Sequence, residues 1–249
     1  MANNIFIDLN ADLGEGLENE KVLMPYLSSC NIACGGHAGN EHTMLSAVNL
    51  AKKYNVKIGA HPSFPDRENF GRKLMVMRPE DLKDSLVKQV TTFLTIAGSQ
   101  NAICHHVKPH GALYNLAARD ESLAQVIAEV VKQFGLGLKL YAPYESAMAK
   151  VAINHDIEVV LEAFADRNYN SDLGLVSRQS PNALITSPKL VLKHIKQIVL
   201  NQKVKTIDGV EVRLKAKTFC IHGDQENALD ILRYLSLNFP DNITITKLR

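Results

Sequence analysis

Residues 103–131 read ICHHVKPHGALYNLAARDESLAQVIAEVV, and they contain one strand followed by one helix. Residues 103–107 are typical of a short strand, which ends at Lys108-Pro109-His110-Gly111. Apolar residues then recur at the spacing of one helix face, at Leu123, Val126, Ile127, Val130 and Val131. A second strand-like run, 138–142, follows. This order predicts two parallel strands joined by a crossover helix.

The same alternation runs through all 249 residues. The strands that we predict cover residues 4–9, 29–33, 56–60, 103–107, 138–142, 157–161 and 218–221, and helical patterns separate most of them. Roughly seven such units predict an α/β fold, a seven-stranded (β/α) barrel. Periodicity does not separate this fold from the alternative, an open doubly wound sheet. Because no internal repeat or linker interrupts the pattern, we predict one domain over residues 1–249.

Composition and charge exclude several classes of protein. Lys and Arg total 28 and Asp and Glu total 26, a formal charge of +2 that argues against a nucleic-acid partner. No apolar run reaches the ~18 residues that span a membrane. The start, MANNIFID, lacks the basic and apolar regions of a secretory signal. We therefore expect a cytoplasmic protein with no membrane partner.

The cysteines fit that expectation. Cys30, Cys34, Cys104 and Cys220 form neither a CxxC motif nor a dense disulfide pattern, so we expect reduced thiols. A zinc site built on Cys30 and Cys34 would lack the second cysteine pair that such sites usually have.

Polar residues alternate with apolar ones in the first strand. Ile5, Ile7 and Leu9 share one face, and Asp8, Asn10 and Asp12 share the other. If the apolar face packs on helices, the polar face points toward the barrel mouth, where parallel folds hold their sites. Turn chemistry explains a single Asp at a loop start, but three aligned polar residues favour a site.

The fourth strand repeats this pattern. His106, Lys108 and His110 share a parity, and His105 has the opposite one. Lys108 and His110 at a strand end are suited to binding a carboxylate or moving a proton. For His106 we expect a structural role, as a buried histidine bonded to backbone.

His37 and His61 also follow predicted strands, each beside Gly or Pro. A lone histidine is more often structural than a ligand. Together with Asp12, however, His37 and His61 supply two imidazoles and one carboxylate, a set that suits a catalytic metal ion. The spacing does not decide between a metal site and separate binding or catalytic roles.

The ends of the sixth and seventh strands add further candidates. Glu162, Asp166 and Arg167 close the sixth strand, and a carboxylate there is suited to activating water while Arg167 holds an anion. The alternative is a surface Asp–Arg pair. Arg178 is a second anion clamp in the loop 163–186, and His222 follows the seventh strand. We expect Asp224 to cap the next helix.

Several common motifs are absent. The chain has no Gly-x-x-x-x-Gly-Lys-Ser/Thr phosphate loop and no Gly-x-Gly-x-x-Gly after a strand. It also lacks a Gly-x-Ser-x-Gly elbow, so a serine hydrolase of that type is not expected.

The strand ends carry a family resemblance. DLNADLGE (8–15), NIACGGHAG (31–39), GAHP (59–62), FGR (70–72), HVKPHGALYN (106–115), EAFADR (162–167), LVSR (175–178) and HGD (222–224) resemble, in this order, motifs of the LamB/YcsF family. Two positions depart from the family pattern: Ala11 stands where Cys is usual, and Gly16-Leu17-Glu18 replaces a Ser-Phe-Gly stretch. We expect both departures to lie in the first loop.

The resemblance implies a fold and an activity. The fold is a seven-stranded (β/α) barrel related to glycoside hydrolases and deacetylases. The activity is that of an ATP-dependent 5-oxoprolinase, a hydrolase that opens the lactam of 5-oxo-L-proline to L-glutamate. ATP is the co-substrate, together with Mg²⁺, and no tightly bound organic cofactor is implied. The partners implied are 5-oxoprolinase subunits B and C.

Residues and resemblance together give a hypothesis with two alternatives. ATP phosphorylates the lactam oxygen, and water activated by Asp12, His61, His110, Glu162 or Asp166 attacks. Asn10, His37, Lys108, Arg167, Arg178 and His222 bind substrate. The alternatives are a stand-alone metal-dependent amidase or deacetylase, and a non-catalytic subunit that binds a small carboxylate.

Overall fold

The computed structural model describes residues 4–135 and 137–247. The two ends of the predicted domain 1–249, and residues 1–3 of the start that we examined for a signal, lie outside these ranges. No described helix is long and apolar enough to cross a membrane.

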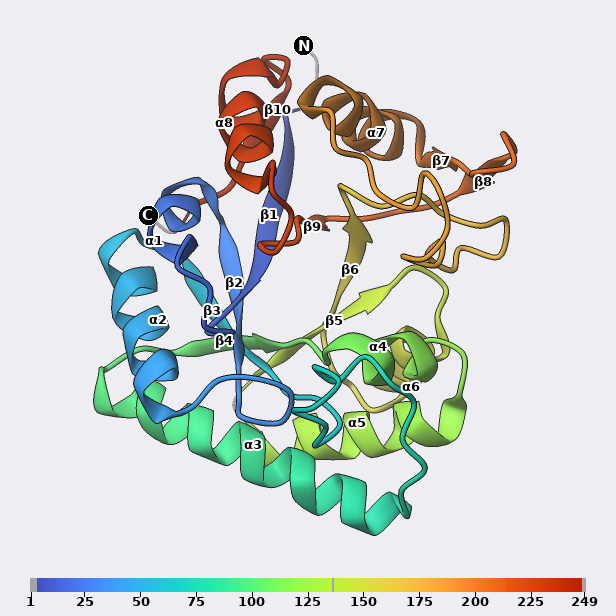
Figure 1. Cartoon of the computed structure of the whole chain (residues 1–249). Coiled ribbons are helices and arrows are strands. Elements are labelled where there is room, and N and C mark those ends of the chain that lie inside the picture. The colour runs from blue at the N-terminus through green and yellow to red at the C-terminus, as the bar shows by residue number, and fades with distance from the viewer. Residues whose placement is uncertain (1–3, 136, 248–249) are drawn as a thin grey trace.

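Seven parallel strands form a closed barrel (Figure 1). Strand β9 pairs with β6 on one side and with β1 on the other, which closes the sheet and excludes the open alternative. The predicted seven-stranded barrel is therefore confirmed. Its strands, in spatial order, are β1 (Ile5–Leu13), β2 (Ser29–Ala33), β3 (Lys57–His61), β4 (Cys104–Val107), β5 (Lys139–Pro143), β6 (Val159–Phe164) and β9 (Thr218–Cys220).

Helices surround the barrel, and neighbouring helices pack on one another: α2 on α3, α3 on α5, α5 on α6, and α7 on α8. Figure 1 shows α3 and α5 side by side along one edge of the molecule. The helical elements are α1 (Glu20–Leu23), the 3-10 helix η1 (Met24–Tyr26), α2 (Glu41–Lys53), α3 (Pro79–Ser99), α4 (Gly111–Ala117), α5 (Glu121–Phe134), α6 (Ala147–Asn154), α7 (Pro188–Asn201) and α8 (Ala228–Asn238).

Within the described ranges, three short strands lie outside the barrel. β7 (Lys203–Lys205) and β8 (Glu211–Arg213) form an antiparallel hairpin around Asp208-Gly209. β10 (Ile243–Ile245), which the sequence did not predict, pairs with Ile5–Ile7 at the start of β1.

Two strand boundaries differ from the prediction. β1 extends to Leu13 rather than 9, because residues 10–13 still pair with β2. Ala11 is therefore a buried strand residue and does not lie in the first loop as we expected. β6 covers 159–164 rather than 157–161, so Glu162 lies inside the strand.

The apolar core lies between the barrel and the helices. Ile7, Leu9, Ala11 and Leu13 of β1 are all buried on the outward face. Each helix turns its apolar stripe toward such residues, as α2 does with Met44, Ala47, Val48 and Ala51. Burying this face is the main favourable contribution to folding, and it leaves the other face of every strand pointing into the barrel.

The inner face tolerates no added volume beside β3. Gly59 is the register partner of His106 in β4, and a Cβ atom at position 59 would overlap the His106 imidazole. The small residue at this point is what makes room for a ring inside the barrel.

We expect Gly59→Ala to lower the free energy of unfolding by about 1–3 kcal/mol, since overpacking forces the His106 ring out of place. Gly98→Ala is the matched control, because Gly98 lies in α3 with no described atom close to its Cβ position. That control should be neutral or stabilising by up to about 1 kcal/mol. Urea unfolding of both variants tests this, and equal effects would contradict the overlap at Gly59.

Candidate active site

The barrel interior is polar from end to end, and its lowest layer surrounds Asp8. The Asp8 Oδ1 atom accepts hydrogen bonds from Ser29 Oγ at 2.7 Å and Thr218 Oγ1 at 2.6 Å. Lys57 Nζ lies 3.8 Å from Asp8 Oδ2. Since barrel interiors are usually filled with branched apolar residues, such a layer indicates an interior built for chemistry.

The middle layer is a network around Asn10. Asn10 Nδ2 donates to Glu162 Oε1 at 2.8 Å and to Thr218 Oγ1 at 2.7 Å, and Asn31 Nδ2 donates to Asn10 Oδ1 at 2.8 Å. His106 Nε2 donates to Asn31 Oδ1 at 2.7 Å. Burial holds the pKa of His106 well below its ordinary value, so the ring is neutral. His106 is thus bonded to a side chain inside the barrel, and our expectation of a backbone partner was wrong.

Lys108 connects the middle and upper layers. Its Nζ lies 3.0 Å from Glu162 Oε1 and 3.1 Å from Asp12 Oδ1, and it also donates to Cys220 Sγ at 3.1 Å. Burial alone would lower the pKa of Lys108, but the Asp12 and Glu162 carboxylates hold it well above its ordinary value. Lys108 is therefore a buried ammonium ion that holds two carboxylates from strands on either side of β9.

The upper layer brings Asp12, His61 and His110 together. His61 Nε2 lies 3.3 Å from Asp12 Oδ2 and 2.9 Å from His110 Nδ1. The other ring nitrogens face backbone carbonyls: His61 Nδ1 is 2.6 Å from Lys108 O, and His110 Nε2 is 3.0 Å from Phe70 O. Burial alone would raise the pKa of Asp12, but the neighbouring His61 and Lys108 hold it well below its usual range.

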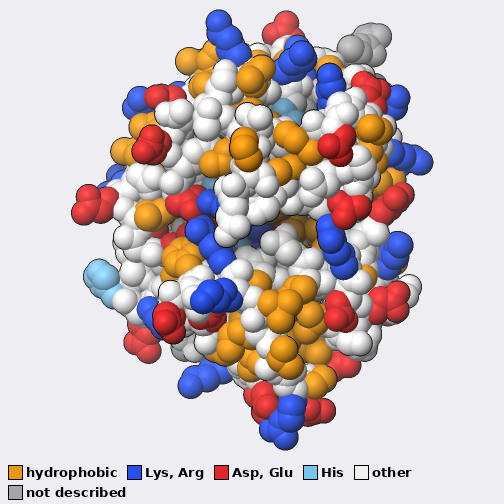
Figure 2. Space-filling model, turned by 45° about the vertical axis from the view of Figure 1, so that its right-hand side comes forward, with side chains coloured by type: hydrophobic (Ala, Val, Ile, Leu, Met, Phe, Trp, Pro, Cys, Tyr) orange, Lys and Arg blue, Asp and Glu red, His pale blue; other side chains and the backbone are white. Residues whose placement is uncertain are grey.

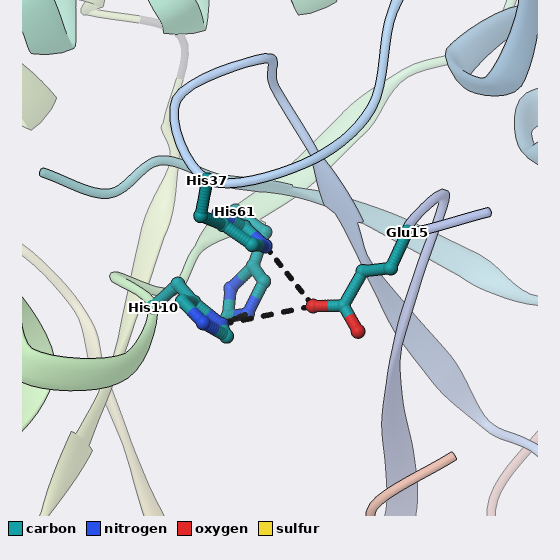
Figure 3. Close-up of side chains that lie close together, drawn as sticks. All are labelled: Glu15, His37, His61 and His110. Atoms are coloured by element: carbon teal, nitrogen blue, oxygen red, sulfur yellow. Dashed lines mark hydrogen bonds and ion pairs between the residues drawn. The ribbon is translucent and has the colours of Figure 1, made fainter. Parts of the chain in front are cut away.

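Glu15 and His37 complete this layer from two loops. Glu15 Oε1 accepts from His37 Nε2 at 3.0 Å and lies 3.7 Å from His110 Nδ1 (Figure 3). The His37 ring stacks on that of His110 at 3.6 Å between centroids. Burial raises the pKa of Glu15 to about 7, with the nearby Asp12 charge adding to it, and burial lowers the pKa of His37 to about 2.

These four residues are the group with the geometry of a metal site among the described residues. The ligand atoms of Glu15, His37, His61 and His110 all lie within 4.8 Å of one another. Of the three metal ligands that the sequence suggested, His37 and His61 belong to this group, and Asp12 lies beside it. Cys30 and Cys34 do not: both are buried free thiols, and burial raises their pKa.

A second group lies at the ends of β6 and β9. Asp166 Oδ2 accepts from the His222 backbone N–H at 2.9 Å, and His222 Nδ1 donates to Asp166 Oδ1, also at 2.9 Å. Burial alone would raise the pKa of Asp166, but His222 keeps it below its ordinary value. Asp166 is fully buried, so it fixes His222, whose ring stacks on Phe164.

Three arginines stand around this second group. Arg167 is buried and donates from Nη2 to Val176 O at 2.6 Å, while its Nε atom has no partner among the described residues. Arg72 Nη2 and Arg178 Nη1 both donate to Asp224 Oδ2, at 2.7 and 3.2 Å. Asp224 therefore pairs with arginines, and our expectation that it caps α8 was wrong: the residue before α8 is Asn227.

Both groups face one cavity of about 890 Å³ at the carboxyl ends of the strands. Figure 2 shows a hollow on one face of the molecule, with Lys and Arg side chains gathered beside it. Of the candidate residues from the sequence, those that line the cavity are Asp12, His61, Lys108, His110, Glu162, Arg167, Arg178 and His222. Asn10, His37 and Asp166 lie behind the lining and contact residues that form it.

Sequence reasoning missed Glu15, Arg72 and Tyr114 as cavity residues. The alternation of side chains along β1 ends at Leu13, and the chain then turns at Gly14 with a φ of +73°. The alternation therefore does not predict where the side chain of Glu15 points. Tyr114 lies in α4, a short helix that has no clear periodicity, and its hydroxyl donates to Glu162 Oε2 at 2.7 Å. The one signal was membership of the motifs 8–15, 70–72 and 106–115.

Known proteins resemble this chain along its length. The sequence model of the LamB/YcsF family matches residues 7–248. A Haemophilus influenzae (strain PittEE) protein, named as the A subunit of 5-oxoprolinase, is 45% identical over 227 residues, or 91% of this chain and 93% of the relative. The crystal structure of a lactam utilization protein from Thermus thermophilus superposes with a TM-score of 0.89 and 36% identity, covering 98% of this chain and 100% of that one. An uncharacterized Agrobacterium tumefaciens C58 protein shares the fold alone, with a TM-score of 0.62, 11% identity, and coverage of 99% and 88%.

We expect Lys108→Met to lower the free energy of unfolding by about 3–5 kcal/mol, because it leaves two buried carboxylates without their cation. The double variant Lys108→Met/Glu162→Gln should recover part of this loss. Lys132→Met, which removes an exposed partner of Asp156, is the control and should cost less than about 1 kcal/mol. Denaturant unfolding measures all three, and a small loss for Lys108→Met would refute the central role of its charge.

The Asp8 layer predicts a pH dependence. Burial raises the pKa of Asp8 above its ordinary 3.8, against the opposing hydrogen bonds from Thr218 and Ser29 and the charge of Lys57. The folded state thus holds this proton more tightly than the unfolded chain, so the stability that Asp8 contributes is present in acid and is lost as pH rises through its folded pKa. The Asp8→Asn variant has no carboxyl at this position, so its stability does not fall with the ionisation of Asp8.

The free energy of unfolding of Asp8→Asn, relative to the parent chain, should therefore rise between about pH 4 and pH 8. Asp156→Asn, at a side chain that is 91% exposed, should show no such trend. A relative stability that falls or stays constant with pH at Asp8→Asn would show that the buried carboxyl is not destabilised in the fold.

Proposed function

Because this chain belongs to the LamB/YcsF family, we propose that it hydrolyses the lactam of 5-oxo-L-proline to L-glutamate, with hydrolysis of ATP and together with 5-oxoprolinase subunits B and C. The observation that carries the proposal is the 45% identity, over 91% of the chain, to a protein named as the A subunit of 5-oxoprolinase. The 36% identical protein from Thermus thermophilus is named for lactam utilization, which agrees in substrate class.

The cavity offers groups for each part of this substrate. The molecule carries one carboxylate, one lactam N–H and one lactam carbonyl. We assign the carboxylate to Arg167, whose buried Nε atom has no partner within the described part of the chain, with Arg178 beside it on the cavity wall. A charge-assisted hydrogen bond from a buried guanidinium is strong enough to fix the substrate's orientation. The lactam then faces the layer of Asp12, His61 and His110.

In the proposed reaction ATP activates the lactam, because an amide carbonyl is a poor electrophile. Transfer of the γ-phosphoryl group to the lactam oxygen forms a P–O bond and releases ADP. Water then adds to the ring carbon and the C–N bond breaks, which gives an acyl phosphate and a free amine that takes up a proton. A second water cleaves the acyl phosphate to glutamate and phosphate.

Asp12 is our choice as the base that takes the proton from water. It faces the cavity, contacts with Lys108 and His61 keep it ionised, and its Oδ2 atom contacts His61. Glu162 is less suited, because its side chain is 0% exposed against 13% for Asp12, and Lys108, Asn10 and Tyr114 contact its oxygens. We assign Glu162 and Asp166 to positioning Lys108 and His222, and we place the lactam carbonyl beside His61 and His110.

We propose that the partner subunits supply much of the ATP site, with Mg²⁺ bound to the nucleotide. The chain has no Gly-x-x-x-x-Gly-Lys-Ser/Thr loop, and the word "subunit" in the relative's name supports an assembly of several chains.

Glutamate release from 5-oxo-L-proline tests the proposal, measured with this chain alone and with subunits B and C, each with and without ATP. We expect turnover only in the complete mixture with ATP. Turnover by this chain alone without ATP would indicate a metal-dependent amidase instead. Binding of 5-oxo-L-proline with no turnover in any mixture would indicate a non-catalytic binding subunit.

In the complete mixture, Asp12→Asn should lower kcat by about 100-fold or more, the usual contribution of a general base. His155→Ala is the matched control, since His155 follows α6, lies outside the cavity and contacts Gln125. Circular dichroism of Asp12→Asn confirms that the barrel is intact. Full activity of that variant would exclude Asp12 as the base.

A further inference from the structure

We propose that Glu15, His37, His61 and His110 bind one divalent transition-metal ion of the zinc type. Three imidazoles and one carboxylate are a ligand set that suits such ions. Each ligand lies at or after the end of a different strand, β1, β2, β3 or β4, so the closed barrel brings together residues that are up to 95 positions apart in the sequence (Figure 3).

The spacing of the ligand atoms fits a single ion. Ligand atoms bound about 2.0–2.1 Å from a tetrahedral ion lie about 3.3 Å apart. Here His61 Nε2 is 2.9 Å from His110 Nδ1, Glu15 Oε1 is 3.0 Å from His37 Nε2, and Glu15 Oε1 is 3.7 Å from His110 Nδ1. These three separations lie near the expected edge, and all four ligand atoms lie within 4.8 Å of one another. The His37 ring, which stacks on His110, has to turn so that the ion lies in its plane.

The protons of His61 and His110 point to a cation between them. His61 donates its Nδ1–H to the Lys108 carbonyl, and His110 donates its Nε2–H to the Phe70 carbonyl. In neutral rings, His61 Nε2 and His110 Nδ1 then bear lone pairs that face each other at 2.9 Å. A positive centre has to lie between these two nitrogens, and backbone carbonyls that fix the outer N–H are typical of metal-bound histidines.

The carboxylates around the site favour the binding of a divalent cation. Three carboxylates, those of Asp12, Glu15 and Glu162, approach the upper layer, and the ammonium of Lys108 balances one of them. Outside this layer, Arg72 and Arg178 bind Asp224. A divalent ion between the imidazoles therefore offsets the carboxylate charge that Lys108 leaves unbalanced.

The cavity gives the ion an open side. Glu15, His61 and His110 line the cavity, whereas His37 lies behind them. Catalytic metal sites keep such an open position for water or substrate. That the ion would bind water or the lactam oxygen there rests on the proposed function, but binding of the ion does not.

Metal binding to the purified chain tests the proposal without any activity measurement. After treatment with a chelator, the chain is titrated with Zn²⁺ by calorimetry and with Co²⁺ by visible absorption. We expect one ion per chain, a micromolar or tighter Kd, and Co²⁺ bands of the intensity of four- or five-coordinate sites. Absence of Zn²⁺ and Co²⁺ binding to the parent chain overturns the proposal, whatever the glutamate assay shows.

Two variants and one control locate the site. His61→Ala and His110→Ala should each weaken Zn²⁺ binding by about 100-fold or more and reduce the Co²⁺ bands. His155→Ala, at a histidine outside the cavity, should leave both unchanged. If a variant fails to fold, Glu15→Gln provides the same test with a side chain of equal size. Undiminished binding by folded variants would place the ion elsewhere and overturn the proposal.

Discussion

The buried ammonium of Lys108 holds the interior of the barrel together. It lies between Asp12 of β1 and Glu162 of β6, which are far apart in the sequence but belong to the two strands that flank β9. Without this charge, two carboxylates would share a buried site, at a cost of several kcal/mol. Asn10 and Asn31 extend the same network, so that one buried cation fixes side chains from four strands.

With a polar interior of this kind, the outward face of each strand contributes stability and the inward face contributes the site. The outward face carries the apolar residues that pack on helices and stabilise the fold. The inward face contributes little apolar burial, and it holds groups whose pKa values are moved by burial and by each other. Strongly perturbed carboxyl and imidazole groups at the mouth of a cavity are typical of functional sites.

The loops after the strands contribute the remaining side chains of the site. Glu15 and His37 reach the upper layer from loops, and Arg72 and Arg178 meet at Asp224 from loops that are 106 positions apart. This arrangement places arginine side chains in the same cavity as a layer of imidazoles and carboxylates. It suits a small substrate with an anionic end and a carbonyl end, which agrees with the lactam named for the relatives.

The α/β class and the order of its strands could be predicted from the sequence, because the alternation of short strands with helical stripes repeats along the chain and needs no long-range information. Closure into a barrel rather than an open sheet depends on the pairing of β9 with both β6 and β1. Parity within β1 and β4 also placed Asn10, Asp12 and Lys108 on the inner face, since side chains alternate regularly along a strand. Which strand ends meet was settled only in three dimensions. Glu15 joins His110, Asp224 joins two arginines rather than capping a helix, and Glu162 pairs with Lys108, because closure of the barrel and the path of its loops set these contacts. Such contacts depend on distances in space, which local sequence patterns do not encode.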